Sequence, residues 1–329
     1  KTGRTIRCVV KNYIPDDVTF RTKPQIATDM VDRALDNGVT VAWWTFDELY
    51  GHDSKFPDAM DERNQRFVAE IPCHTRVWTK KPTVIRDEPN EGCGRPKKTP
   101  RLADDVKPSE VRNLVKHSSK FYLQSWQHYR IKDTHKGPEV WTIKYLTVWR
   151  QTSQHLPSTR CTLIVARSVR TGETKFFLAN GVVGEDGVTL RGLLRVAFGR
   201  WAVEAEFRLS KEELGLDHFE VRGWRCIHRH YYVTGLSFLL CSRIRQTLDK
   251  DDTRQLTVEQ VRRSLNTWLQ HHDLPQPLRD AQFEKELNDQ RYYQRRNAQA
   301  IKSHTKTRIE LYANLGIDVD KIKSCVQTL

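Results

Sequence analysis

Three charged residues in the second half of the chain have the types and the spacing of a phosphodiester-cleaving site. Arg200, Glu204 and Lys211 fall on one face of a helix predicted over about 200–213. The carboxylate of Glu204 suits a divalent ion, and the cations suit phosphate oxygens, as in two-metal displacement at phosphorus. Oxygen ligands without a Cys and His cage favour Mg²⁺ or Mn²⁺. The alternative, which the spacing alone favours, is ordinary salt bridging on an exposed helix.

A second carboxylate, Asp47, follows a predicted strand. Residues 39–46 form a near-continuous apolar run, which is typical of a strand covered on both faces. Asp47 comes directly after its carboxyl end, where the ligands of open α/β sheets bind. An Asp in this place is also a common helix cap, so the position alone leaves both interpretations open. Together with Glu204, Asp47 makes a shared metal site the sharper hypothesis.

Cations without counter-charges gather near the end of the chain. Between residues 291 and 308 there are six Lys and Arg and no acid. This run favours contact with nucleic-acid phosphates over a merely solvated helix face. The candidate phosphate-binding residues are Arg291, Arg295, Arg296 and Lys302.

Three tryptophans fall in or beside a β-rich stretch. Such rings can stack on an unpaired base. Packing inside a small sheet is the alternative, and it is the favoured one. The three residues are Trp126, Trp141 and Trp149.

Composition limits the class of protein. The 329 residues carry 55 Lys and Arg against 41 Asp and Glu, a net charge of +14, which points to nucleic acid as the partner. No apolar run approaches the length of a membrane span, so we expect no membrane partner. The seven cysteines include no Cys-x-x-Cys pair, which indicates a reduced, cytoplasmic protein.

Short-range patterns in the sequence predict the helices and strands that must position these residues. A helix is predicted from Thr22 to Asn37-Gly38, a hairpin over 129–149 and another over 161–179. A capping box at Thr257 begins a helix with Val261, Leu265 and Trp268 on one face, and a basic helix follows over about 289–315. We divide the chain into an α/β segment (1–78), a basic Pro-rich linker (79–116), an all-β block (117–182), a helical return (183–248) and a basic helical region (249–329).

Two blocks of the sequence resemble insertion-sequence transposases of the DDE class. Phe46-Asp-Glu-Leu-Tyr-Gly51 is similar to their second-Asp region. Arg200, Glu204 and Lys211 fit their Tyr–Arg–Glu–Lys signature, although the Tyr position falls on Ala197. The resemblance extends over about residues 10–325.

The resemblance implies a fold and a set of roles. The fold is α/β, a ribonuclease-H-like catalytic domain (1–78 and 183–248) interrupted by an all-β insertion, with a C-terminal helical tail. Asp47 and Glu204 would hold two Mg²⁺ or Mn²⁺ ions, and Arg200 and Lys211 would hold DNA phosphates. The partners would be double-stranded mobile-element ends and target DNA, bound by a homodimer at the bacterial nucleoid.

One expected residue has no counterpart. The first Asp of the class should precede the block that begins at Ile14, and none of the 13 residues before it is acidic. The sequence therefore predicts an N-terminally truncated transposase that binds DNA but neither nicks nor joins it. Two alternatives stay open: a non-catalytic DNA-binding remnant or domesticated transposase, and a ribonuclease-H-like nuclease that does not join strands.

Overall fold

The computed structural model describes residues 13–85, 99–103, 106–249 and 256–326. The chain divides into two compact units. The helical unit combines residues up to Phe20 with Trp201–Lys302, and the sheet unit combines Arg21–Arg200 with residues from Ser303 onward. Every strand of the described residues lies in the sheet unit. No described helix is both long and apolar enough to cross a membrane.

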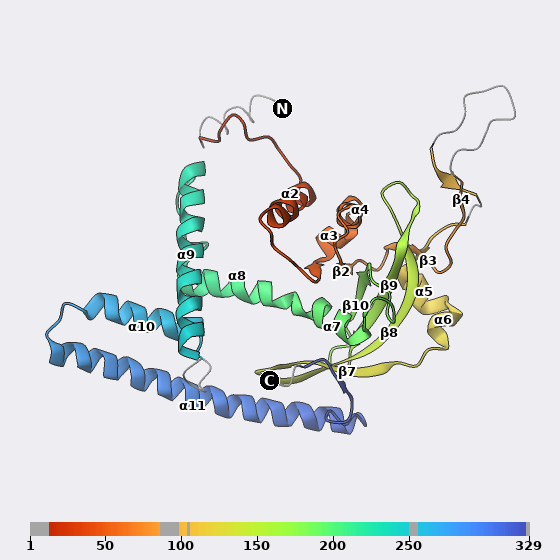
Figure 1. Ribbon diagram of the computed structural model, residues 1–329. Helices are drawn as coiled ribbons and strands as arrows, with labels where there is room; N and C mark the ends of the chain where they lie inside the picture. The colour runs from red at the N-terminus through yellow and green to blue at the C-terminus, as the bar shows by residue number, and fades with distance from the viewer. Residues whose placement is uncertain (1–12, 86–98, 104–105, 250–255, 327–329) are drawn as a thin grey trace. The chain divides into compact units, whose positions relative to one another are not determined.

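Nine strands of the sheet unit form one mixed sheet (Figure 1). The path begins with a parallel pair, β1 (Trp44–Phe46) and β2 (Phe67–Ile71), and β2 is antiparallel to β10 (Thr174–Ala179). It continues through β9 (Pro157–Ser168), β8 (Gly137–Gln151), β3 (Arg76–Trp78) and β6 (Ser109–Glu110), while β7 (Gln127–Thr134) joins β8 to β11 (Lys323–Ser324). The mixed α/β class is confirmed. The strands expected as a separate β block instead continue the sheet of β1 and β2.

The two predicted hairpins are confirmed. β7 turns into β8 through His135 and Lys136, and β9 turns into β10 after Ser168. Gly172 in the second turn has φ of +73°, a left-handed conformation that glycine adopts without a Cβ penalty. Local turn chemistry thus fixes both pairings.

The first helix begins and ends where the sequence predicts, but the strand after it is shorter. α2 (Lys23–Asp36) has a capping box in which Thr22 and Gln25 exchange hydrogen bonds, and Gly38 follows the helix with φ of +74°. Of the apolar run 39–46, only β1 pairs. Among the described strands β1 is an edge with β2 as its one neighbour, so the residues before it have no ladder to join.

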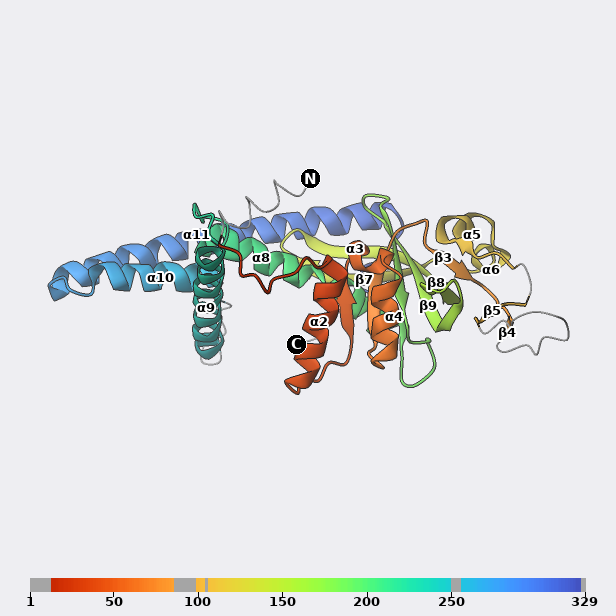
Figure 2. The same ribbon diagram turned by 90° about the horizontal axis from the view of Figure 1, so that it is seen from above.

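Helices cover both faces of the sheet, and residues alternate between two cores. Phe67 of β2 packs with α2, α4 (Lys55–Glu62), α5 (Val111–His117) and α6 (Ser119–Tyr122), whereas its neighbour Val68 packs with α7 (Leu190–Gly199). α2 and α4 lie side by side (Figures 1 and 2), where Arg63 donates to Asp32 at 2.8 Å. The cores therefore anchor β2 from both sides.

The segment expected as a linker, 79–116, is partly built into this unit. β6 pairs with β3, and Val111 and Leu114 of α5 are buried in the core. The two-residue strands β4 (Val84–Ile85) and β5 (Arg101–Leu102) pair with each other. The intervening basic run Gly94–Arg101 lies mostly outside the described residues. Five prolines made this segment resemble a linker, but its apolar spacing after residue 108 matches a buried short helix.

The described part of the helical unit contains four helices. α8 (Trp201–Leu214), α9 (Trp224–Asp249) and α10 (Val258–His271) share a small core around Cys241 and Val261. α10 and α11 (Gln276–Asn314) run side by side, joined by Arg263 and Glu286 at 2.9 Å (Figure 1). The capping box at Thr257 is confirmed. Trp268 was expected on the buried face and is instead 51% exposed.

The C-terminal end of α11 belongs to the sheet unit. Tyr312 is buried, and its hydroxyl donates to the carbonyl of Pro138 at 3.2 Å and accepts from the N–H of Val140 at 3.3 Å. β11 then adds to β7 in parallel, with Lys323 beside Tyr129. The helix begins earlier than the predicted 289.

Candidate functional site

Asp47 lies at the carboxyl edge of the parallel pair, as predicted. β1 and β2 end at the same edge, and the half-buried Asp47 directly follows β1. It is also the N-cap of α3 (Glu48–His52): one carboxylate oxygen accepts from the N–H of Leu49 at 3.1 Å and of Tyr50 at 3.5 Å. Its other oxygen has no hydrogen bond from a described residue. The helix-cap role is therefore present, and one oxygen stays available for a ligand.

A charge cluster that the sequence did not reveal stands at the same edge. Ala69 is the register partner of Phe46, so Glu70 on β2 is one residue past that pair, as Asp47 is on β1. The two carboxylate oxygens of Glu70 meet Lys175 of β10 at 2.9 Å and Arg200 at 3.4 Å. Arg200, predicted to bind phosphate, is thus paired here with a carboxylate. Glu70 and Lys175 are 105 residues apart, so no local pattern could have linked them.

The position of Asp47 depends on how tightly α3 packs against β2. A Cβ on Gly51 would lie 2.0 Å from the carbonyl oxygen of Glu70 and 3.2 Å from Cγ2 of Ile71. The obstacle is the backbone of a central strand, which cannot give way as a flexible side chain could. Glycine is therefore required at this residue of the Phe46–Gly51 block.

The other signature residues lie in the helical unit. Glu204 and Lys211 are both exposed on α8, which confirms the predicted helix. Ala197, at the Tyr position of the signature, is buried on α7. Asp47 lies in the sheet unit and Glu204 in the helical unit.

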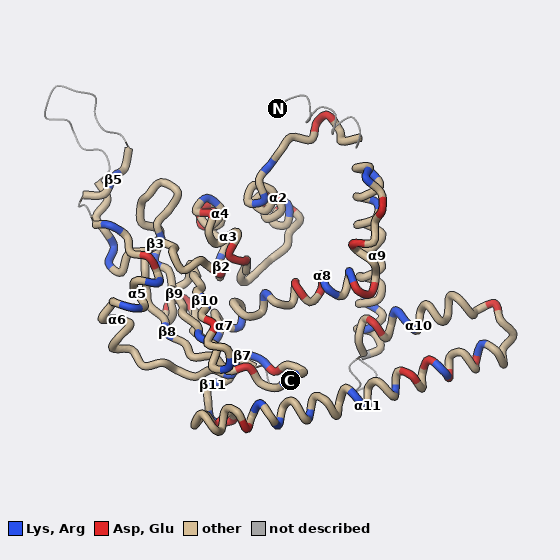
Figure 3. Tube along the Cα trace, turned by 180° about the vertical axis from the view of Figure 1, so that it is seen from behind, with Lys and Arg blue, Asp and Glu red and all other residues tan. Residues whose placement is uncertain are grey.

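The cations predicted to contact phosphates line α11 (Figure 3). All four are exposed, and none forms an ion pair with another described residue; they are Arg291, Arg295, Arg296 and Lys302. Arg296 lies over the ring of Tyr292. Arg308, in the same run, instead donates to the carbonyl of Gly137 at 3.1 Å and fastens the helix to the sheet unit.

The three candidate stacking tryptophans are packed to different degrees. Trp141 is buried, and its ring centroid lies 5.0 Å from that of Phe198. This tryptophan therefore packs inside the sheet unit, which is the alternative that the sequence favoured. Trp126 is half-buried, with Lys144 and Arg167 about 5 Å from its ring. Trp149 is half-buried and is the register partner of Trp78.

Residues 9–138 match the family described as DDE superfamily endonuclease. The matched segment contains Asp47, α3 and Glu70, and it ends before α8. It supports a DDE-type nuclease or transposase family, which generally uses divalent metal ions and acts on DNA. No curated protein matches the chain.

The described residues do not complete a metal site. No three His, Cys, Asp or Glu side chains gather among them where they could hold an ion. At the carboxyl edge, both carboxylate oxygens of Glu70 are paired with cations. The carboxylate oxygen available to a metal ion there is the one on Asp47 that accepts no hydrogen bond from a described residue. We therefore derive no chemical step through a metal ion from this geometry.

Proposed function

We propose that this chain is of the DDE transposase type, a class whose reaction is metal-dependent cleavage and joining of DNA at the ends of a mobile element. The observation that carries the proposal is the place of Asp47. It lies at the carboxyl edge of the parallel strand pair, inside the segment matched by the endonuclease family. Asp47 and Glu204 are the proposed carboxylates for Mg²⁺ or Mn²⁺, with Arg200 and Lys211 beside them. A ribonuclease-H-like frame and a homodimer on DNA belong to the same proposal.

One observation favours a second candidate, a DNA-binding remnant without catalysis. Among the described residues no three metal-binding side chains gather, whereas two-metal displacement needs several carboxylates. Both candidates bind duplex DNA, so they differ in metal binding. The two experiments below separate them.

The first experiment measures the salt dependence of duplex DNA binding. The triple variant Arg295→Ala, Arg296→Ala, Lys302→Ala should bind more weakly, and the slope of log K against log salt should flatten by about 2.7. Each lost phosphate contact removes about 0.9 from that slope, because fewer counterions are released. The matched control changes Lys136, Arg160 and Arg170 to Ala, three exposed cations of the sheet unit, one on β9 and two at turns, and should keep the slope. An unchanged slope in the α11 variant would make that helix a solvated surface.

The second experiment asks whether Asp47 and Glu204 share an ion. Two ions about 4 Å apart can be shared only if the two carboxyl carbons lie within about 10 Å. Fe²⁺ in place of Mg²⁺, with ascorbate and peroxide, generates radicals that cut the nearby backbone. We expect cuts near residues 47 and 204, competed by Mg²⁺ and lost together in Asp47→Asn.

The control is Glu48→Gln, an exposed neighbour outside the proposed pair, which should keep both cuts. Cuts at one position alone would contradict a shared site. No cuts, with DNA binding intact, would identify the non-catalytic remnant.

A further inference from the structure

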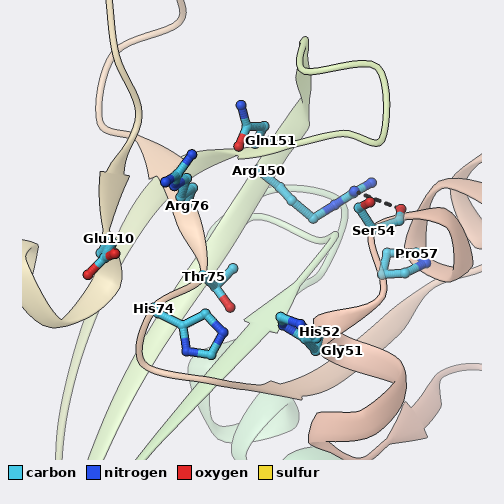
Figure 4. Close-up of a pocket in the computed structure, with 10 residues that line it drawn as sticks. All are labelled: Gly51, His52, Ser54, Pro57, His74, Thr75, Arg76, Glu110, Arg150 and Gln151. Carbon is cyan, nitrogen blue, oxygen red and sulfur yellow. Dashed lines mark hydrogen bonds between the residues drawn. The ribbon is translucent and has the colours of Figure 1, made fainter.

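A polar pocket of about 310 Å³ opens beside the carboxyl edge of the parallel pair (Figure 4). His52 ends α3, the helix that follows β1, and His74 and Thr75 lie in the loop that follows β2. Arg76 begins β3, and Arg150 of β8 closes the floor. The volume is at the low end of ligand pockets, about 300–1,000 Å³. Both strands of the parallel pair thus lead into it.

The loop that carries His74 and Thr75 is held in place by α5. The backbone N–H of Val111 donates to the carbonyl of Thr75 at 3.0 Å, and that of Arg112 donates to the carbonyl of Cys73 at 2.9 Å. The rings of His52 and His74 meet edge to face, 5.1 Å apart. The pocket is therefore formed by fixed backbone on two sides.

Two of the side chains that line this pocket each have one buried polar atom without a hydrogen-bond partner among the described residues. These atoms are Nε of Arg150, whose side chain is 4% exposed, and Oγ1 of Thr75. The guanidinium is held by Asp58 at 2.6 Å and Asp61 at 2.9 Å, so Arg150 is fixed among the residues that line the pocket. Because both unpaired atoms are buried, a ligand in the pocket would meet the donors of the exposed side chains instead.

The charges at the rim favour an anion with several acceptor oxygens. Glu110, the acidic residue lining the pocket, forms an ion pair with Arg112 at 2.6 Å. Arg76 is exposed and forms no ion pair with another described residue. The guanidinium of Arg76 and the imidazoles of His52 and His74 line one cavity and can donate to the oxygens of a phosphate group.

We propose that this pocket binds one phosphate group of the DNA backbone. The assignment to DNA rests on the proposed function, whereas the phosphate chemistry rests on the pocket alone. Arg76 would supply the unpaired charge, and the imidazoles of His52 and His74 would donate beside it. Bound there, the phosphate would fix the DNA beside the edge that carries Asp47.

The test begins with small probes, so that it does not depend on DNA binding. Inorganic phosphate and dimethyl phosphate are titrated at constant ionic strength while the imidazole NMR signals of His52 and His74 are followed. His52→Gln and His74→Gln assign the signals. We expect both signals to shift to saturation with dimethyl phosphate, the diester probe. Arg76→Ala should weaken that binding at least tenfold, and Arg170→Ala, an exposed arginine in a distant turn, should leave it unchanged.

A second measurement ties the pocket to DNA. Arg76→Ala should flatten the salt slope of duplex binding by about 0.9, and Arg170→Ala should not. Shifts with inorganic phosphate but not dimethyl phosphate would overturn the DNA assignment in favour of free phosphate. No shift with either probe, or equal shifts in Arg76→Ala, would mean that the pocket holds water only. If the wild-type chain binds no DNA, the proposed function fails while the small probes still decide the phosphate site.

Discussion

Replacing Arg150 by methionine is expected to destabilise the sheet unit by about 3–5 kcal/mol. Its guanidinium is buried between Asp58 and Asp61 of α4, whose side chains are 18% and 22% exposed. Breaking a buried ion pair leaves uncompensated charges in a medium of low polarity, hence the size of the effect. At about 2–4 °C per kcal/mol for a domain of this size, the melting temperature should fall by roughly 6–20 °C. Thermal unfolding followed by circular dichroism measures it.

The pKa of Arg150 agrees with this view of the cluster. Burial lowers the pKa, but the charge of Asp58, with smaller contributions that include Asp61, outweighs it and holds the pKa above the usual value for arginine. The guanidinium is therefore charged in the folded protein.

Two controls isolate the burial of charge. Adding Asp58→Asn and Asp61→Asn to Arg150→Met removes the stranded carboxylates and should recover most of the loss. Arg160→Met breaks a pair of the same chemistry with Glu185, where both side chains are about half exposed, and should change stability by less than about 1 kcal/mol. Equal losses in Arg150→Met and Arg160→Met would contradict a buried charge cluster.

Gly51→Ala is expected to cost about 3 kcal/mol, the upper range for overpacking a rigid site. The new Cβ would meet the carbonyl oxygen of Glu70 at 2.0 Å, so α3 must move off β2. Because Asp47 caps α3, the displacement also moves the proposed metal-binding carboxylate. Urea unfolding should show a lower midpoint with an unchanged slope.

Gly199→Ala is the matched control for Gly51→Ala. It lies in the last turn of α7 in the same unit, and nothing is within 4 Å of its ideal Cβ. Alanine is the better helix former there, so stability should hold or rise slightly. A Gly51→Ala protein as stable as wild type would show that α3 does not pack on β2 as described.

Local signals in the sequence were enough to predict α2 and the two hairpins. Thr22 and Gln25 lie three residues apart and together start α2. Gly172 fits the left-handed turn between β9 and β10, and Asp47 follows its strand within one residue. Each of these features involves neighbours in the chain, so residue type and spacing contain the information.

Contacts between distant residues could not be predicted in the same way. Glu70 meets Lys175 of the neighbouring strand β10 and Arg200 at the end of α7, and Arg150 meets Asp58 across about 90 residues. Nothing near Arg150 shows that it will be buried. The 79–116 segment illustrates the same limit, since prolines indicate a linker while Val111 finds its core partners elsewhere in the chain.

The order of the strands along the chain has a consequence for how the protein folds. β2 pairs with β10, and β7 pairs with β11, so that Lys323 joins Tyr129 with residues Trp201–Lys302 of the helical unit between them. Closing such long loops costs conformational entropy before the stabilising contacts form, which makes folding slow. During synthesis β7 keeps one edge unpaired until residue 324 has left the ribosome, whereas the helical unit is complete some twenty residues earlier. The nascent chain therefore exposes an open strand edge throughout the making of α8–α11, and that edge is where aggregation would begin.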